Sequence, residues 1–193
     1  MLVLFINGSP RRSGTVAGML EVVRREAESR GAETAWADAG GLSVAPCRGC
    51  MACRTRGECV LPADDAQRVL SLMRRADAIV VGAPCYWGNM PGQLKVLFDR
   101  IVYGMMGESW GGLPRPLHRG KRALVVVACT TPWPFNIIFR QSAGTVRALR
   151  EILRWSGFRI VGTVQRGGTK TRRGIDGRCE KRLARLAARL LKG

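Results

Sequence analysis

Short runs of uninterrupted apolar residues recur along this chain, and they constrain its fold more than any other feature. Four of them carry no helical periodicity: Leu2–Ile6, Ala78–Gly82, Ala123–Ala128 and Phe158–Val164. A fifth, weaker candidate is Glu33–Ala37. All-apolar stretches of this length are typical of strands that are buried on both faces, as in parallel sheets covered by helices. The chain is therefore expected to contain a parallel sheet of five strands.

Amphipathic segments separate the apolar runs and predict the helices that connect the strands. They are Val16–Arg30, Asp65–Arg75, Gly92–Val102, Ser142–Trp155 and Gly177–Leu191. Strands that alternate with helices imply right-handed crossovers, and hence an α/β fold in which a doubly wound five-stranded parallel sheet has helices on both faces. At 193 residues the chain suits a single domain over residues 1–193.

Ligands of a doubly wound sheet bind outside the carboxyl ends of its strands. The loops predicted at this edge are residues 7–15, 38–63, 83–91 and 129–137. Functional residues are therefore expected in these four loops.

Composition favours an intracellular protein without a membrane span. The chain has no charged-then-apolar leader and no uninterrupted apolar run of about 18 residues, so export and membrane insertion are not expected. Its seven cysteines are an odd number, and four of them fall within residues 47–59. This crowding fits reduced thiols or cofactor ligands better than disulfides, so a cytoplasmic location is expected.

The formal net charge of +18 at pH 7 raises the question of a polyanionic partner. Neutralised phosphates add counterion-release free energy to nucleic-acid binding. The arginines, however, are scattered, their density rises only between Arg166 and Arg189, and no aromatic residues are interleaved with them. Solvated basic helix faces are the simpler interpretation, so nucleic acid is not the expected partner. Acidic redox partners or anionic cofactors could exploit the same field.

The loop after the first strand predicts a phosphate site. It reads Asn7-Gly8-Ser9-Pro10-Arg11-Arg12-Ser13-Gly14-Thr15. Its hydroxyls and backbone N–H groups can donate to an anion, and the helix that follows presents its positive end. The loop lacks the Lys-Ser/Thr of a nucleotide-triphosphate site and the G-x-G-x-x-G pattern of a dinucleotide site. A monophosphate such as that of FMN fits better, and an ordinary helix cap is the alternative.

A second loop predicts a planar ligand. It follows the strand at Ala78–Gly82 and reads Pro84-Cys85-Tyr86-Trp87-Gly88-Asn89-Met90-Pro91-Gly92. Two adjacent aromatic residues can line a flat ring, and the backbone N–H groups of Gly88, Asn89 and Met90 can reach its heteroatoms. An isoalloxazine edge would suit this loop. The alternative is a surface loop whose aromatic side chains only cover the end of the sheet.

Four cysteines in the loop after the weak second strand predict an iron–sulfur cluster. Cys47, Cys50 and Cys53 are separated by two residues each, and Cys59 follows after five. Thiolates at this spacing can wrap a compact four-cornered core, whereas zinc usually takes cysteine pairs from two separated knuckles. Zinc and unliganded thiols are the alternatives.

The residues around these cysteines suit a cluster. Gly49 and Gly57 would let backbone N–H groups approach the sulfurs. The residues expected to offset the negative charge of a thiolate-ligated cluster are Arg48, Arg54 and Arg56.

The segment Cys129-Thr130-Thr131-Pro132-Trp133 ends the fourth strand and is expected to form a third wall of the flavin site. Thr130 is assigned to cofactor binding. Trp133 would flank or gate the ring, or lie at a partner interface instead.

The remaining reactive side chains predict no separate catalytic set. Cys85 and Cys179 are interpreted as small buried or helix-face residues, and His118 as a surface residue in a Gly/Pro-rich stretch. Asp64 and Asp65 are predicted to cap the helix that follows them. No Ser/His/Asp or Cys/His set is therefore expected.

In combination these motifs resemble the flavodoxin-like NADPH-dependent FMN reductase family, and specifically its iron–sulfur flavoprotein branch. The resemblance covers roughly the first 100 residues with high specificity in combination. The segments that carry it are Gly8-Ser9-Pro10-Arg11, the cysteine loop with Asp64-Asp65, and Pro84-x-Tyr86-Trp87-Gly88 leading to Lys95 and Asp99-Arg100. The remainder of the chain agrees only in the order of its elements.

The resemblance implies a flavodoxin-like fold that binds FMN at the strand ends. The family holds the phosphate with residues that match Ser9, Arg11, Ser13 and Thr15, and the ring with the loop that matches Pro84 to Met90. The expected cofactor-binding set is Ser9, Arg11, Ser13, Gly14, Thr15, Pro84, Tyr86, Trp87, Gly88, Asn89, Met90 and Thr130. One departure is that the family usually continues Asn-Thr after the position of Gly14, where this chain has Thr15-Val16.

The resemblance also implies a [4Fe-4S] cluster and an assembly that is a homodimer or a tetramer. The implied cluster ligands are Cys47, Cys50, Cys53 and Cys59. Trp110, Trp133 and Trp155 lie outside the predicted strands, which fits a flavin pocket closed by a neighbouring subunit.

The expected function is that of an FMN-dependent oxidoreductase. NAD(P)H or a reduced carrier would deliver electrons to FMN, which passes them, with the cluster, to a quinone, flavin or protein acceptor. The flavin carries the chemistry, so no catalytic side chain is assigned. The alternative is an electron-transfer iron–sulfur flavoprotein that exchanges electrons with ferredoxin and lacks a dedicated small-molecule substrate. A third hypothesis, nucleic-acid binding, would need a contiguous basic face.

Overall fold

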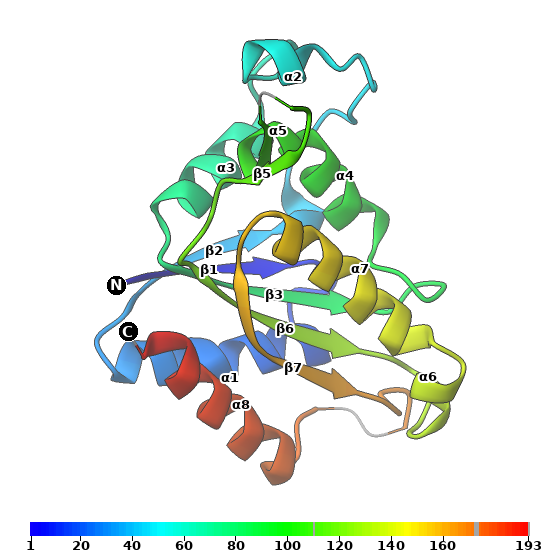
Figure 1. Cartoon of the computed structure of the whole chain (residues 1–193). Coiled ribbons are helices and arrows are strands. Elements are labelled where there is room, and N and C mark those ends of the chain that lie inside the picture. The colour runs from blue at the N-terminus through cyan, green and yellow to red at the C-terminus, as the bar shows by residue number, and fades with distance from the viewer. Residues whose placement is uncertain (110, 172–173, 193) are drawn as a thin grey trace.

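The computed structural model describes residues 1–109, 111–171 and 174–192, and its centre is a five-stranded parallel sheet (Figure 1). In the order in which they lie side by side, the strands are β2 (Glu33–Asp38), β1 (Leu2–Asn7), β3 (Ala78–Pro84), β6 (Arg122–Ala128) and β7 (Arg159–Arg166). Every neighbouring pair is parallel. This strand order is that of flavodoxin-like folds. The predicted fold class and all five predicted strands are confirmed.

Helices cover both faces of the sheet, as Figure 1 shows. One face carries α1 (Thr15–Ser29) and α8 (Gly177–Leu191), and the other carries α3 (Asp65–Arg75), α4 (Gly92–Arg100) and α7 (Gln141–Trp155). The core is divided accordingly into two clusters, because successive strand residues point to opposite faces. In the described part of the chain, none of the helices has the length and apolar character that a membrane crossing requires.

The position of each strand in the sheet explains how clearly the sequence predicted it. The central strands β1, β3 and β6 bury nearly every side chain, so their sequences are almost entirely apolar. The edge strands β2 and β7 are mostly half-buried. A half-buried edge strand tolerates polar residues such as Glu33 and Thr34, which is why β2 gave the weakest pattern.

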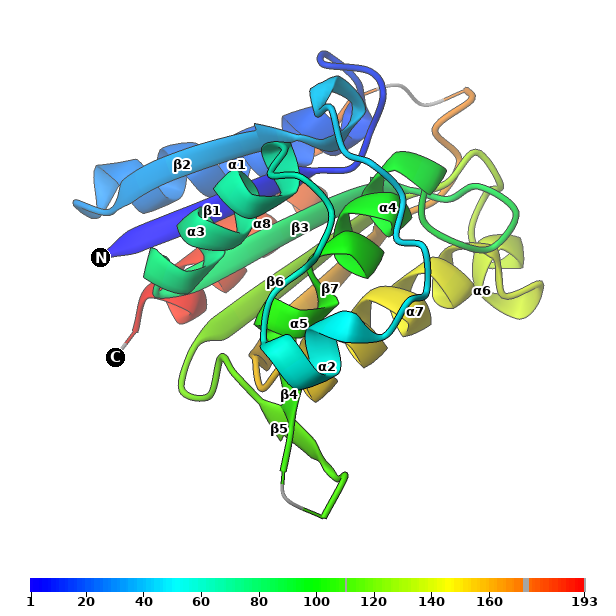
Figure 2. The ribbon, with the colours of Figure 1, turned by 90° about the horizontal axis from the view of Figure 1, so that it is seen from above.

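The structure adds elements that are too short to leave a periodic pattern. These are the antiparallel hairpin of β4 (Met106–Glu108) and β5 (Pro114–Pro116), the short helices α2 (Ala52–Arg56), α5 (Val102–Met105) and α6 (Phe135–Ile138), and a 3-10 turn at Ala39–Gly41. Figure 2 shows the hairpin projecting away from the sheet. The predicted helix Gly92–Val102 is interrupted after Arg100, where α4 ends and α5 follows.

The interpretation of His118 as a surface residue is wrong. Its side chain is only 1% exposed, and its ring stacks on Phe158 with the ring centroids 4.8 Å apart. The imidazole Nε2 lies 3.1 Å from the carbonyl oxygen of Gly104, to which it donates in the neutral form. A Gly/Pro-rich stretch predicts a turn, but it does not predict what the turn packs against. Here the turn packs against the end of α7, where the His118 N–H donates to the carbonyl oxygen of Ser156 at 2.9 Å.

Neutral, buried His118 is expected to make folding stability depend on pH. Burial lowers its pKa from 6.5 to about 4, and the charge of Lys121 adds to the shift. The unfolded chain therefore takes up a proton at higher pH than the folded one, so the contribution of His118 is complete above pH ~6.5 and is lost as pH falls toward about 4. At about 1.36 kcal/mol per pKa unit, the loss is roughly 3 kcal/mol.

Urea unfolding of the wild type and of His118→Gln at pH 7 and near pH 4.5 measures this contribution. The variant should be less stable at neutral pH but should lose less stability than the wild type on acidification. Equal losses in the two proteins would show that His118 does not titrate as its burial requires.

Candidate functional site

The carboxyl ends of β1, β3 and β6 bring three of the predicted loops to one edge of the sheet. These strands end at Asn7, Pro84 and Ala128. The register pairs Asn7 with Gly82 and Pro84 with Ala128, so the strands leave the sheet side by side. Figure 1 shows their arrowheads at the same edge. The adjoining loops are residues 8–14, 85–91 and 129–134, which together can contact one ligand.

Hydrogen bonds fix the first loop from within. The Asn7 side-chain Nδ2 donates to Asp38 at the end of β2, at 2.8 Å, and its Oδ1 accepts the N–H of Ser9 at 3.0 Å. The Ser9 hydroxyl oxygen accepts the backbone N–H of Arg11 at 3.1 Å, and Ser9 is buried. Ser9 therefore shapes the loop, whereas Arg11 and Ser13 are exposed and accessible to a ligand.

α1 begins without a side-chain cap. Its N-cap residue is Gly14, in extended conformation, with no side-chain hydrogen bond and no acidic residue in the first turn of the helix, which starts at Thr15. α3 and α8 differ, because Asp64 and Asp176 accept hydrogen bonds from their first turns, which confirms the predicted cap at Asp64. The free N–H groups and the positive end of this 15-residue helix favour an anion at the first loop.

The loop after β3 is a tight turn with an exposed indole. Tyr86 and Asn89 exchange backbone hydrogen bonds of 2.8 and 2.9 Å. Between them, Trp87 and Gly88 have φ values of 52° and 73°, a left-handed conformation that glycine adopts easily and tryptophan rarely. Trp87 is fully exposed, whereas Met90 is buried and its N–H donates to Asn89 Oδ1 at 2.8 Å. Strained backbone conformations cluster at functional sites, so the exposed Trp87 is a candidate to contact a ligand or a neighbouring subunit.

The third loop and the start of α6 tie polar groups to α7, and three residues of the loop stay exposed. The Thr131 hydroxyl donates to Gln141 Oε1, and Asn136 Nδ2 donates to the Ser142 hydroxyl at 2.8 Å. Thr130 is exposed and Trp133 is 77% exposed. Pro132 is exposed as well, so Thr130, Pro132 and Trp133 are the exposed residues of the loop that a ligand could contact.

α6 carries an apolar surface that the sequence patterns did not single out. Its exposed apolar side chains are Phe135, Ile137, Ile138 and the following Phe139. The rings of Phe135 and Phe139 stack with centroids 5.9 Å apart. Trp133 lies next to this surface in the sequence, Trp155 is 55% exposed at the end of α7, and Trp110 lies outside the described residues. The density of aromatic and branched residues over 133–139 was the available signal.

All four cysteines of the predicted cluster line one pocket of about 450 Å³. Cys47 and Cys50 are exposed, and Cys53 and Cys59 are half-buried. Burial raises the pKa of the Cys53 thiol, and the charges of Cys59, Cys47 and Cys50 raise it further. The shared pocket places the four cysteines in one neighbourhood. Gly49 donates its N–H to Cys47 Sγ at 3.5 Å, as predicted, whereas the N–H of Gly57 donates to the carbonyl oxygen of Cys53 at 3.0 Å and not to a sulfur.

Arginine dominates the walls of the cysteine pocket. The lining arginines are Arg48, Arg54, Arg56, Arg74, Arg100 and Arg115, and the lining acids are Asp99 and Glu108. Arg54 pairs with Glu108 of β4 at 2.8 Å, which ties α2 to the hairpin. Figure 1 shows α2 lying over α5 and the hairpin. A positive pocket suits a thiolate-ligated group that carries negative charge.

Arg100 is a buried cation in this pocket with unused donors. It is 1% exposed, its Nη2 donates to Pro62 O at 2.9 Å, and it lies 3.6 Å from Asp64. Its Nε and Nη1 find no hydrogen-bond partner among the described residues. Buried guanidinium donors without an acceptor are costly, so an anionic group held in the pocket would be stabilised by Arg100.

The four cysteines line the wall of one pocket without forming a ready-made ion site. Among the described residues, no three His, Cys, Asp or Glu side chains are grouped so as to hold one metal ion. A [4Fe-4S] core carries its thiolates on separate corners, whereas zinc draws four sulfurs to within about 2.3 Å of one centre.

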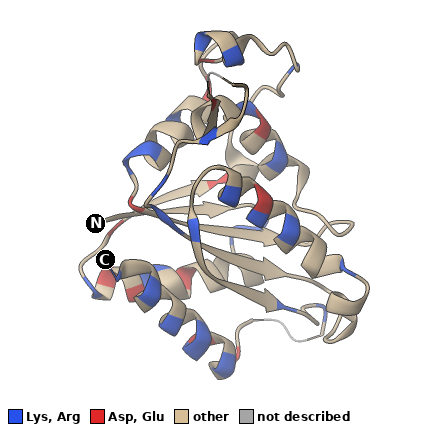
Figure 3. Cartoon of the chain, viewed as in Figure 1, with Lys and Arg blue, Asp and Glu red and all other residues tan. Residues whose placement is uncertain are grey.

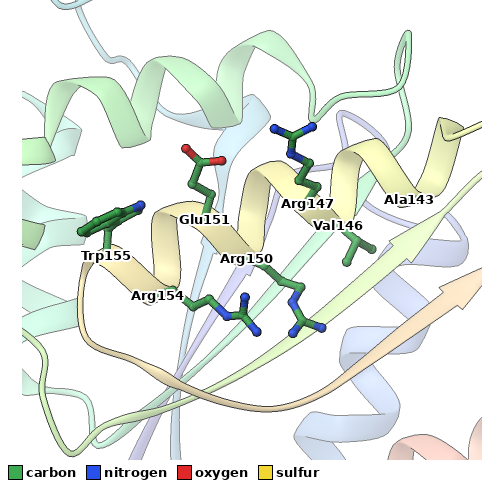
Figure 4. Close-up of a pocket in the computed structure, with 7 residues that line it drawn as sticks. All are labelled: Ala143, Val146, Arg147, Arg150, Glu151, Arg154 and Trp155. Atoms are coloured by element: carbon green, nitrogen blue, oxygen red, sulfur yellow. The ribbon is translucent and has the colours of Figure 1, made fainter.

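A larger groove lies away from the predicted residues, along the outer face of α7 (Figure 4). Its volume is about 770 Å³, and it is lined by Ala143, Val146, Arg147, Arg150, Glu151, Arg154 and Trp155. Figure 4 shows Arg150 and Arg154 pointing to one side of the helix and Arg147 and Glu151 to the other. Figure 3 shows basic residues on most helices, of which this stripe is one part. The three- and four-residue spacing of these arginines was the signal that could have found it.

Comparison with curated proteins finds iron–sulfur flavoproteins. One from Methanosarcina thermophila is 42% identical over 102 residues, which cover 53% of each chain. Another, from Archaeoglobus fulgidus, is 40% identical over 108 residues, which cover 56% of this chain and 52% of the relative. The chain spans about half the length of the curated relatives it matches.

Comparison with solved structures supports the fold. An FMN-dependent NADH-azoreductase from Bacillus anthracis str. Ames Ancestor, in complex with FMN, has a TM-score of 0.77 at 16% identity, with 99% of each chain covered. An NAD(P)H:quinone oxidoreductase from Methanothermobacter marburgensis has a TM-score of 0.67 at 18% identity, with 98% of this chain and 94% of that one covered. At these identities the likeness concerns the fold alone.

The family comparison covers most of the sequence. The family profile described as NADPH-dependent FMN reductase matches residues 1–170. The chain belongs to the NADPH-dependent FMN reductase family.

Proposed function

We propose that this chain is an FMN-dependent NAD(P)H oxidoreductase that carries a [4Fe-4S] cluster. The observation that carries the proposal is the edge of the sheet where an uncapped helix N-terminus adjoins an exposed aromatic turn. Bound FMN would supply hydride and single-electron transfer. Electrons would pass from NAD(P)H or a reduced carrier to a quinone, flavin or protein acceptor. The names of the curated relatives support the cluster.

The residues of the first loop would have two different roles in binding the FMN phosphate. Ser9 and Gly14 shape the turn, and Arg11 and Ser13 are exposed and able to donate to phosphate oxygens. The N–H groups of the first turn, beginning at Thr15, would complete the phosphate shell. The residues proposed to hold the ring are Pro84, Tyr86, Trp87, Gly88, Asn89, Met90 and Thr130.

Removal of the Arg11 guanidinium is expected to weaken FMN binding. A charge-assisted contact to phosphate contributes about 1.5–3 kcal/mol, so Arg11→Ala should raise the dissociation constant by roughly 10- to 150-fold, measured by quenching of FMN fluorescence. Arg25→Ala is the matched control, because Arg25 is also exposed but lies ten residues beyond Thr15, the first residue of α1, which is about 15 Å along the helix. No affinity of the wild type for FMN would refute the central proposal.

The cysteine pocket would hold the cluster through Cys47, Cys50, Cys53 and Cys59. The two unused Arg100 donors and the surrounding arginines would lower the cost of the negative charge. α4 begins at Gly92 beside the ring loop and ends at Arg100 in the pocket wall, nine residues or about 14 Å along one helix. The proposed flavin and cluster therefore flank the same helix.

Four cysteines within residues 47–59 fit reduced thiols or cofactor ligands, which supports a cytoplasmic location.

An anaerobic absorption spectrum of freshly purified protein, followed by reduction, tests the function. Fast reduction of flavin by NADH or NADPH supports the oxidoreductase. Sluggish reduction by both nicotinamides with fast exchange with ferredoxin would instead favour the electron-transfer protein. Absence of both flavin and cluster signals after reconstitution would contradict both functions.

Self-association as a homodimer or tetramer is the expected quaternary state. The support is the apolar surface of Phe135, Ile137, Ile138 and Phe139 beside the exposed Trp133. Light scattering at micromolar concentration should give a mass of two or four chains, and a Phe139→Asp variant should shift it downward. A single-chain mass for the wild type would contradict the expectation.

A further inference from the structure

Two cysteines stand next to each other where β3 and β6 leave the sheet. The register pairs Pro84 with Ala128, and the next residues are Cys85 and Cys129. The ladder continues past the strand ends, because the Cys85 N–H donates to Ala128 O at 2.8 Å. The Cys129 N–H donates to Arg166 O at 2.8 Å in the same way. Cys85 and Cys129 therefore occupy facing positions on neighbouring parallel strands.

Both side chains point to the face of the sheet that α7 covers. Side chains two residues apart in a strand share a face, and Ala83 and Val127 belong to the core cluster on the α7 side. Cys85 packs against that cluster. The Cys129 thiol lies 3.5 Å from Oε1 of Gln141, the first residue of α7.

The two thiols are close to each other as well as to α7. Burial raises the pKa of the Cys85 thiol, and the neighbouring Cys129 is among the groups that raise it further. Facing residues of adjacent strands have Cα atoms about 4.8 Å apart, which falls inside the range of about 4.4–6.8 Å that a disulfide spans. The spacing of neighbouring strands is therefore compatible with a disulfide between these positions.

We propose that Cys85 and Cys129 form a redox-active dithiol site that exchanges with small-molecule disulfides. Cys85 is the entry, because it is half-buried, whereas Cys129 is only 3% exposed. The Cys85 thiol gives up its proton, and its thiolate attacks one sulfur of the disulfide R–S–S–R. The S–S bond breaks, RS⁻ leaves and takes up that proton as R–SH, and a mixed disulfide forms on Cys85. Cys129 then attacks the Cys85 sulfur and expels the second thiol. The net reaction converts one protein dithiol and one R–S–S–R into a protein disulfide and two R–SH.

The position of the pair gives the bond a structural consequence. Cys85 begins the turn that carries Trp87, and Cys129 begins the loop that carries Thr130. Oxidation would lock the starts of two loops together at the edge of the sheet. The site consists of the chain's own sulfurs, and Cys85 lies between Pro84 and Tyr86, two of the residues proposed to hold the flavin ring.

The test treats the intact protein with bis(2-hydroxyethyl) disulfide, traps free thiols and maps the peptides by mass spectrometry. In the wild type we expect a Cys85–Cys129 linked peptide that dithiothreitol removes. Cys129→Ser should instead accumulate one hydroxyethyl adduct on Cys85, because the resolving thiol is gone. Cys85→Ser should show neither product. Cys179→Ser is the matched control, since Cys179 is a buried cysteine on α8 against the opposite core cluster, and it should behave as the wild type.

Two results would overturn the proposal. One is the absence of a Cys85–Cys129 peptide in folded wild type while the same peptides link after unfolding. The other is the absence of a Cys85 adduct in folded Cys129→Ser. Loss of iron or flavin in any of these proteins leaves the peptide map readable, so failure of the proposed function is distinguishable from failure of this inference.

Discussion

A Cys50→Ser variant reconstituted anaerobically is expected to contain far less iron and acid-labile sulfide than the wild type. A [4Fe-4S] cluster places about four iron atoms in each chain and needs a soft sulfur ligand at each corner, which a serine hydroxyl replaces poorly. Cys50 lies between Cys47 and Cys53 in the pocket wall. Cys85, Cys129 and Cys179 do not line that pocket, so they are not placed to substitute for the lost thiolate.

The control for this experiment is a cysteine that the pocket does not use. Cys179→Ser changes a buried thiol on α8, on the far face of the sheet, and should keep the wild-type content of iron and sulfide. Equal iron content in Cys50→Ser and in the wild type would show that Cys50 is not a cluster ligand. A wild type that takes up no iron would leave an FMN reductase with a free cysteine loop, and stoichiometric zinc in its place would assign the loop to a single ion.

The fold was predictable because its central strands are buried on both faces. Burial forces β1, β3 and β6 to be almost wholly apolar, and the connecting helices keep one apolar stripe each, so both signals survive in the sequence. The three-residue strands β4 and β5 carry no such signal, because a hairpin of this length has no periodicity to detect. The local hydrophobic pattern therefore predicts the sheet but not the hairpin that lines the cysteine pocket.

The site was predictable where a loop motif is contiguous and not where it depends on packing. The first loop and the turn at Tyr86–Asn89 can be read from adjacent residues. The burial of His118 and the unused donors of Arg100 depend on elements far apart in the chain, which only the fold brings together. The proximity of Cys85 and Cys129 likewise follows from strand register and not from spacing.

A Gly144→Ala variant is expected to bind FMN at least about tenfold more weakly, although alanine is the better helix former. Gly144 lies in α7 where the helix touches the turn proposed to hold the flavin ring. A Cβ at this position would lie 2.2 Å from the carbonyl oxygen of Gly88, which is backbone and cannot rotate away. The turn must therefore shift, and its displacement is transmitted to the residues on either side of Gly88, which are Asn89 and the left-handed Trp87.

Gly177→Ala separates this steric effect from the general effect of alanine in a helix. Gly177 begins α8, and a Cβ there meets nothing within 4 Å, so this variant should keep wild-type affinity for FMN. Circular dichroism and urea unfolding identify any loss of folding in either variant. A folded Gly144→Ala protein with unchanged FMN affinity would mean that the ring does not depend on the turn at Gly88. A selective loss in Gly144→Ala would mean that α7 sets the position of the turn, so that a helix supplying none of the proposed FMN contacts still controls the geometry of the site.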